Sequence, residues 1–293
     1  MAPTMLARLA LPEVRLPALP QDPRILQIAF LGSFLVAGLT FLDFELSLWQ
    51  PPVILATACA TQWAMTRLYR VPDAGYRSAL ITSLGLALLL RSDVFWVPPL
   101  AAFAAIASKF VIRVRGKHVF NPTNLGLAAC LFLTPHAWSS PSQWGESAGL
   151  IAWFGIFGLS VAHRAFRSDV SLAFLASWVA LKAARVLYLG QRPAVLLHQL
   201  NVGSLILFTF FMISDPKTTP DRRSARIALA AAVAVLAFVL QHSFWWYNAL
   251  IWALVILSCF VPLTDRLLPA ARYQWPAERK PECPPQSVPL PSP

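Results

Sequence analysis

Two stretches of the sequence place polar and charged side chains beside apolar runs, in patterns that suit anion binding. The first runs from residue 108 to 124, where Lys117 and His118 come shortly before Asn121 and Pro122. Asn is a preferred N-cap and Pro suits the first helical turn, so a helix is predicted to begin here. The free amides of a helix start, next to a Lys and a His, suit an anion such as a phosphate. A capped helix start without a ligand is the structural alternative.

The second stretch runs from residue 210 to 220 and holds one acid, Asp215, at the end of an apolar run. Pro216 prevents the helix from continuing past this acid. A carboxylate at the edge of an apolar run is costly unless it caps, pairs or binds something. The alternatives to a ligand are an ion pair with Lys217 or Arg222, or a cap on the following turn.

The composition places these two stretches in a polytopic membrane protein. Hydrophobic residues make up 57% of the 293 residues and charged residues 13%, about half the share of about 25% in soluble proteins. The net charge is +11. So few charges cannot supply both a soluble surface and a basic face for nucleic acid, which excludes that partner. No HExxH or HxxxH spacing is present, so no metal site is predicted.

Ten apolar segments are candidates to cross the membrane. They are continuous and do not alternate with polar residues, which predicts helices and an all-α fold. Their limits are about 25–43, 51–67, 77–91, 94–112, 121–137, 147–163, 170–188, 199–214, 226–242 and 246–263.

The basic residues support this number of segments. If successive connections alternate between two sides, 20 of the 24 Lys and Arg fall on one side and four on the other. The positive-inside rule then predicts that both termini are cytoplasmic, in a multi-pass protein of the inner membrane.

Weak internal similarity suggests two halves, about residues 25–137 and 147–263. Asp93 and Asp215 end two corresponding segments, and Asn121 and Asn248 begin two others. Five segments per half would invert one half relative to the other and place a site between them. The domain organisation predicted is therefore a cytoplasmic segment 1–24, a membrane domain 25–265, and a Pro-rich, disordered cytoplasmic tail 266–293.

Four stretches resemble motifs of one family, the membrane subunits RnfD and NqrB of the Rnf and Na⁺-pumping NADH:quinone oxidoreductase complexes. The similarity extends over about residues 25–275. The stretches are Ser78-Ala79-Leu80-Ile81-Thr82, Phe120-Asn121-Pro122, the run 210–218 that contains Ser214-Asp215-Pro216, and Val261-Pro262-Leu263-Thr264-Asp265.

This resemblance implies ten transmembrane helices in two inverted halves, similar to urea and ammonium channels. It also implies a bound flavin, electron transfer within the membrane, other subunits of an electron-transport complex and coupling to Na⁺ or H⁺ movement. The residues that it suggests for flavin binding are Ser78, Thr82, Lys117, His118, Asn121, Thr123, Asn124, Asp215 and Thr218.

One connection departs from the family pattern. The parent subunits carry FMN covalently on a Thr in a long insertion between the fifth and sixth helices, whereas here the connection is only residues 134–146. Its one threonine, Thr134, precedes Pro135 without the attachment motif. We therefore expect riboflavin or FMN to be held non-covalently. The short loop also resembles the divergent UnbU-type branch of the family.

Two other functions remain open from the sequence. The inverted-repeat fold also supports a channel or transporter for a small solute, although the acids Asp93, Asp215 and Asp265 lie near segment ends. A non-catalytic scaffold for a biosynthetic redox partner is the third interpretation, which the short loop favours.

Overall fold

The computed structural model of the chain describes residues 22–41, 44, 46–71, 75–140 and 148–275. The predictions about the segment before residue 22 and the tail after residue 275 lie outside the described residues. The elements, in chain order, are α1 (Pro23–Thr40), α2 (Gln50–Leu68), α3 (Tyr76–Leu89), β1 (Leu90–Ser92), α4 (Val97–Val111), β2 (Arg113–Val114), β3 (Lys117–His118), α5 (Pro122–Leu133), β4 (Ala137–Ser139), α6 (Ala148–Arg164), α7 (Ser168–Tyr188), α8 (Pro193–Leu200), α9 (Gly203–Leu207), the π-helix η1 (Phe208–Met212), α10 (Arg223–Ser243), α11 (Ala249–Ser258) and α12 (Val261–Leu267).

The structure is that of an all-α membrane protein, as the apolar segments predicted. Three of the described helices, α1, α7 and α10, are long and apolar enough to cross a membrane, and the number rises to five if each of two bent pairs is one span. The helices α3, α4 and α5 are apolar but shorter than a full span. Each of the ten apolar segments coincides with a helix or a helix pair, but length and composition alone do not establish ten spans.

Two segments that we expected to be single helices are broken. The pair α8 and α9–η1 bends by 59°, and the pair α11 and α12 bends by 42°. At the first break Val202 has extended backbone angles, so the helix cannot pass through it. At the second break Pro262 lies in the first turn of α12, where its missing N–H interrupts a helical ladder at no cost.

Two expected helices also end early, because their last residues form short strands. The segments 77–91 and 121–137 end as helices at Leu89 and Leu133. Beyond them β1 and β4 pair antiparallel, with Leu90 opposite Ser139. The buried Arg91 accounts for part of this, since its guanidinium donates to the carbonyl oxygens of Leu90 (2.8 Å) and Phe44 (3.2 Å).

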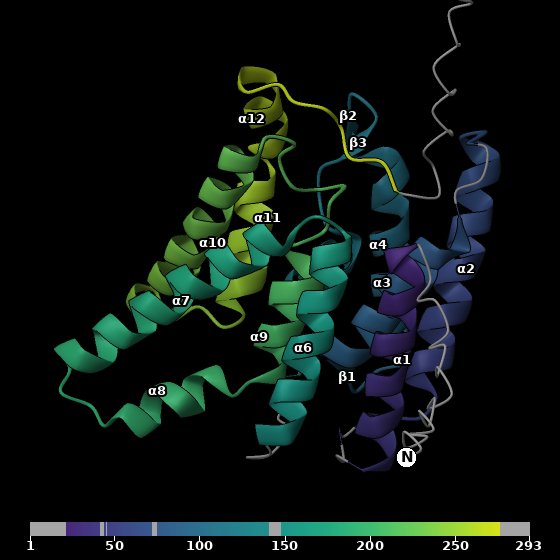
Figure 1. The fold of residues 1–293 in the computed structure, drawn as a ribbon. Helices are drawn as coiled ribbons and strands as arrows, with labels where there is room; N and C mark the ends of the chain where they lie inside the picture. Colours follow the sequence, from purple (N-terminus) through teal and green to yellow (C-terminus); the bar gives the residue numbers. More distant parts are fainter. Residues whose placement is uncertain (1–21, 42–43, 45, 72–74, 141–147, 276–293) are drawn as a thin grey trace, which may run out of the picture.

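The turns that carry most of the basic residues meet at one end of the molecule. Lys117 in the β2–β3 hairpin contacts the carboxylates of Asp221 at 3.0 Å and Asp265 at 2.7 Å. Arg167 donates to the hydroxyl of Thr219 at 3.0 Å. We call this the hairpin end, and the opposite end, with β1, β4 and α8, the α8 end (Figure 1). The Lys117 and Arg222 turns therefore lie on the same side, as the charge distribution predicted.

The helices of the first half meet those of the second along a seam. Phe30 of α1 packs against Phe154 of α6 and Phe211 of η1, with ring centroids 5.3 and 5.2 Å apart. Asn124 of α5 donates to the carbonyl oxygen of Ile251 in α11 at 3.1 Å. In Figure 1 the purple and blue helices lie on one side of this seam and the green and yellow helices on the other.

Candidate functional site

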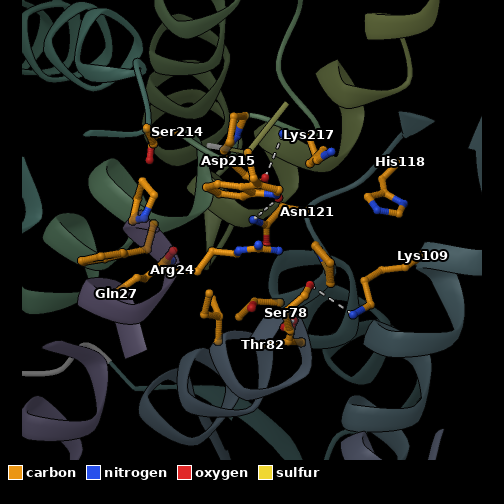
Figure 2. Close-up of a pocket in the computed structure, with 18 of the residues that line it drawn as sticks. Arg24, Gln27, Ser78, Thr82, Lys109, His118, Asn121, Ser214, Asp215 and Lys217 are labelled. Atoms are coloured by element: carbon orange, nitrogen blue, oxygen red, sulfur yellow. Dashed lines mark hydrogen bonds between the residues drawn. The ribbon is translucent and has the colours of Figure 1, made fainter. Parts of the chain in front are cut away.

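A cavity of about 270 Å³ opens at the hairpin end of the seam, and side chains from both halves line it. The start of α1, the start of α3, the end of α4 and the start of α5 contribute from the first half. The second half contributes α6, η1 and the turn 214–217. Figure 2 shows the labelled polar side chains converging from these elements: Arg24, Gln27, Ser78, Thr82, Lys109, His118, Asn121, Ser214, Asp215 and Lys217.

Lys109, near the end of α4, supplies a buried cation to the cavity. Its side chain belongs to a residue only 5% exposed, and its ammonium donates to the hydroxyl of Ser78 at 3.3 Å. Thr82 lies one turn further along α3 and donates to the carbonyl oxygen of Ser78 at 2.9 Å. A buried ammonium is costly unless its donors are used, so one hydroxyl contact leaves Lys109 able to donate to a ligand.

Asn121 and Asp215 join the two halves at the cavity wall. The side-chain oxygen of Asn121 accepts the amide of Asn124 at 3.0 Å, which is the N-cap that the sequence predicted. The side-chain nitrogen of Asn121 donates to a carboxylate oxygen of Asp215 at 3.3 Å (Figure 2). One asparagine thus ends the α5 backbone ladder and holds the only acid that lines the cavity in the described residues.

Asp215 also caps the turn that follows it. Its other carboxylate oxygen accepts the amide of Lys217 at 3.0 Å, so the capping alternative raised from the sequence is present together with the cavity position. Burial raises the pKa of the Asp215 carboxyl, while this amide and the nearby cations oppose that rise. Burial and the neighbouring cations lower the pKa of His118 to about 4, so His118 is neutral near pH 7.

Aromatic and apolar side chains form the remaining walls. Phe210 and Phe211 of η1 line the cavity together with Trp275, which returns from the C-terminal side of α12. The Arg24 guanidinium lies over the Trp275 ring, 4.9 Å from its centroid, a cation–π contact. Flat apolar walls beside a cluster of donors suit a planar ligand with polar edges. The volume lies at the lower end of ligand pockets, about 300–1,000 Å³.

Six of the nine residues predicted to bind a cofactor line this cavity: Ser78, Thr82, His118, Asn121, Thr123 and Asp215. The other three lie outside it. Lys117 is held by Asp221 and Asp265, and Asn124 bonds across the seam to Ile251. Thr218 is buried with its hydroxyl directed to the carbonyl oxygen of Asp215 at 3.4 Å.

The sequence interpretation missed several cavity residues. Lys109 and Arg113 were counted only as charges that set orientation, and Arg24, Gln27 and Trp275 were not singled out. A signal was present for Lys109, because a lysine inside an otherwise apolar helix marks a functional position. No such signal exists for Trp275, since only the fold brings it back to α1.

The described residues hold no group of three or more His, Cys, Asp and Glu that could bind a metal ion. The chemistry of the cavity is therefore that of ammonium, guanidinium, amide and hydroxyl donors around one carboxylate. Such a set binds and orients a polar ligand and tunes its charge.

Comparisons with known proteins agree with the motifs. Residues 140–274, just under half of the chain, match the model of the NQR2, RnfD, RnfE family. The chain is also 29% identical over 175 residues to the RnfD protein of the ion-translocating oxidoreductase complex of Stutzerimonas stutzeri. That match covers 56% of this chain and 48% of the relative, so the chain spans about half the relative's length. The two matches confirm the resemblance to RnfD and NqrB that the sequence indicated.

Proposed function

We propose that this chain, which is similar to the NQR2, RnfD, RnfE family over residues 140–274, is a membrane subunit of an electron-transport complex and holds a flavin in the cavity at the hairpin end. The observation that carries the proposal is the composition of that cavity, in which buried polar donors and aromatic walls meet at the seam. The subunit passes electrons within the membrane, and the complex couples this step to cation transport.

The cavity residues fit a flavin better than they fit a small inorganic anion. Lys109, Ser78 and Asn121 offer donors to carbonyl oxygens or to hydroxyl groups of a side chain. Phe210, Phe211 and Trp275 offer flat surfaces to a ring system. A bound flavin supplies one- and two-electron redox chemistry, while the protein sets its position and electrostatics.

Each polar residue then has a stated part in binding. Lys109 stabilises negative charge on the ligand from a buried position, where Coulombic interactions are strong. Asn121 fixes Asp215, so that this carboxylate does not repel an electron-rich ligand directly. His118 is neutral near pH 7 because of its lowered pKa, and it accepts or donates one hydrogen bond without adding charge.

The flavin is held non-covalently. Thr134 is a buried C-cap of α5 at the α8 end, remote from this cavity, and the residues 141–147 of the same connection lie outside the described residues. The α5–α6 connection therefore offers no described threonine to this site. Riboflavin and FMN are the ligands to test.

The membrane arrangement proposed is ten spans in two inverted halves, with both termini in the cytoplasm of a cell with an inner membrane. The alternation of helices between the hairpin end and the α8 end supports it. It would put the hairpin end, and so the flavin, at the cytoplasmic surface. Other subunits of the complex are the expected partners.

A binding titration tests the proposal. The detergent-purified protein is titrated with riboflavin and with FMN, following the quenching of flavin fluorescence, for the wild type and for Lys109→Met. We expect saturable binding that weakens about tenfold or more in the variant, the size expected for one charged hydrogen bond. Arg223→Met, which removes an exposed charge outside the cavity, is the matched control.

Two results would reject the proposal. One is the absence of saturable binding of either flavin. The other is equal binding by the wild type and Lys109→Met. Solute flux in liposomes that does not depend on flavin would favour the channel hypothesis instead.

A further inference from the structure

A second cavity, of about 320 Å³, lies at the opposite end of the second half. The end of α7, the connection from α8 to α9, the end of α10 and the start of α11 surround it. It shares no lining residue with the cavity at the hairpin end. In Figure 1 the joined ends of α7 and α8 lie apart from the bundle at this end.

The second cavity holds a buried cation without an acid. Lys182 of α7 is 3% exposed. Its ammonium donates to the side-chain oxygen of Gln241 at 2.8 Å, lies 3.1 Å from the His242 ring, and lies 4.8 Å from the centroid of the Trp178 ring. No carboxylate of the described residues lies within ion-pair distance of it. A buried charge with only neutral partners is costly, so an anion at this point would lower the free energy of the protein.

The sequence around the cavity has no acid to supply that charge. No Asp or Glu occurs between Val170 and Ser214, or between Ile227 and Thr264. Three of the four Lys and Arg assigned to this end of the molecule, Lys182, Arg185 and Arg192, fall in the first of these ranges. The α8 end is therefore locally positive, although it has few charges.

The start of α11 adds a second group that favours an anion. Asn248, Ala249 and Leu250 line the cavity, and the first turn of α11 has no side-chain cap, because Asn248 adopts left-handed angles (φ 59°). The side-chain oxygen of Asn248 instead accepts the hydroxyl of Ser139. Uncapped first-turn amides carry the positive end of the helix dipole.

A third group needs a donor from the ligand. The side-chain oxygen of Gln199 is buried and has no hydrogen-bond partner among the residues that the structure describes. Val202, Leu205, Phe208 and Leu250 form apolar walls beside it. The ligand that fits has a negative group, at least one hydroxyl donor and an apolar body.

We propose that the second cavity binds an acidic glycerophospholipid from the bilayer. The phosphate would lie between Lys182 and the first turn of α11, a headgroup hydroxyl would donate to Gln199, and the acyl chains would leave along the apolar wall. The site is independent of the flavin proposal, since the two cavities share no residue and a lipid carries no redox chemistry.

Lipid retention tests the site with probes of defined composition. The purified protein is exchanged into detergent with equal amounts of phosphatidylglycerol and phosphatidylcholine, and native mass spectrometry measures the lipid that stays bound. We expect the wild type to retain phosphatidylglycerol preferentially, and Lys182→Met to lose this preference, with at least about tenfold weaker retention. Arg185→Met, on the same helix but outside the cavity lining, should keep it.

Three outcomes would overturn the proposal. These are equal retention of both lipids by the wild type, unchanged preference in Lys182→Met, and equal loss in Arg185→Met. Thermal stabilisation by inorganic phosphate as large as that by phosphatidylglycerol would assign the cavity to a free anion and reject the lipid. If Lys182→Met does not fold, Leu250→Trp, which fills the cavity from its apolar side, takes its place with the same expected loss.

Discussion

The two cavities at opposite ends of the molecule differ in how each balances a buried lysine. At the hairpin end Lys109 shares its cavity with Asp215, and Asn121 holds that acid while capping α5. At the α8 end Lys182 has no acid, and Asn248 leaves the start of α11 uncapped. The first cavity has a nearly complete set of polar partners, so it suits a ligand bound by hydrogen bonds. The second has an excess of positive character, so it suits an anion.

The two asparagines show why similar sequence signals do not guarantee similar roles. Both precede a helix, and the sequence paired them as equivalent positions of two halves. Asn121 has extended angles and a Pro after it, which allows its side chain to accept a first-turn amide. Asn248 has left-handed angles, so its side chain points elsewhere and contacts Ser139.

The largest expected effect separates the cavities by packing. A Cβ at Gly126 would lie 2.5 Å from the carbonyl oxygen of Ala101 in α4, so Gly126→Ala must push apart the helices that carry Lys109 and Asn121. We expect the free energy of unfolding to fall by about 1–3 kcal/mol and riboflavin binding to weaken, while phosphatidylglycerol retention persists. Thermal unfolding in detergent and the two binding assays measure this.

Gly155→Ala is the control, because a Cβ there meets nothing within 4 Å and Ala favours a helix over Gly. Equal stability of the two variants would show that α4 and α5 are not closely packed at Gly126.

The next effect is a double dissociation between the two lysines. Lys109→Met should weaken riboflavin binding about tenfold and leave lipid retention unchanged. Lys182→Met should do the reverse, because the cavities share no lining residue. If either variant impaired both ligands by similar factors, the cavities would not be independent sites.

A smaller effect distinguishes the two asparagines. Ser caps a helix as well as Asn does, so Asn121→Ser should change the free energy of unfolding by only a few tenths of a kcal/mol. Asn248→Ser should cost about 1 kcal/mol, since Ser tolerates left-handed angles less well, and Asn248→Gly should restore stability. Thermal midpoints of the three variants check this order. A reversed order would mean that the roles of the two residues are exchanged.

The smallest effect near neutral pH concerns His118. Its folded pKa of about 4 lies below its unfolded value of about 6.5, so the unfolded chain binds the proton first. Its contribution to stability is complete above pH of about 6.5 and is lost as pH falls toward about 4. We expect His118→Gln to unfold with the same pH dependence as the wild type from pH of about 7 to 8, and to lose less stability in acid. Parallel curves at all pH values would contradict the lowered pKa.

Much of the architecture follows from the sequence because it depends on local patterns. Apolar runs located the helices, and the alternation of basic connections placed Lys117 and Arg222 on the same side, as the contact of Lys117 with Asp221 confirms. The cap at Asn121 was also predictable, since Asn followed by Pro is a local signal.

The rest depends on tertiary contacts that no local pattern contains. The strands β1 and β4 form because two helix ends come together and pair. Trp275 reaches the first cavity only after the chain returns past α12 to Arg24. Lys182 looked like an ordinary charge at a helix end, and its burial beside Gln241 and Trp178 becomes visible only in the folded protein.

The most direct test of the central claim is the absorption spectrum of the native protein purified from membranes. The account predicts a flavin spectrum that accompanies the protein through detergent purification and is released into the supernatant when the protein is denatured. A colourless preparation that also fails to take up added riboflavin or FMN would contradict it.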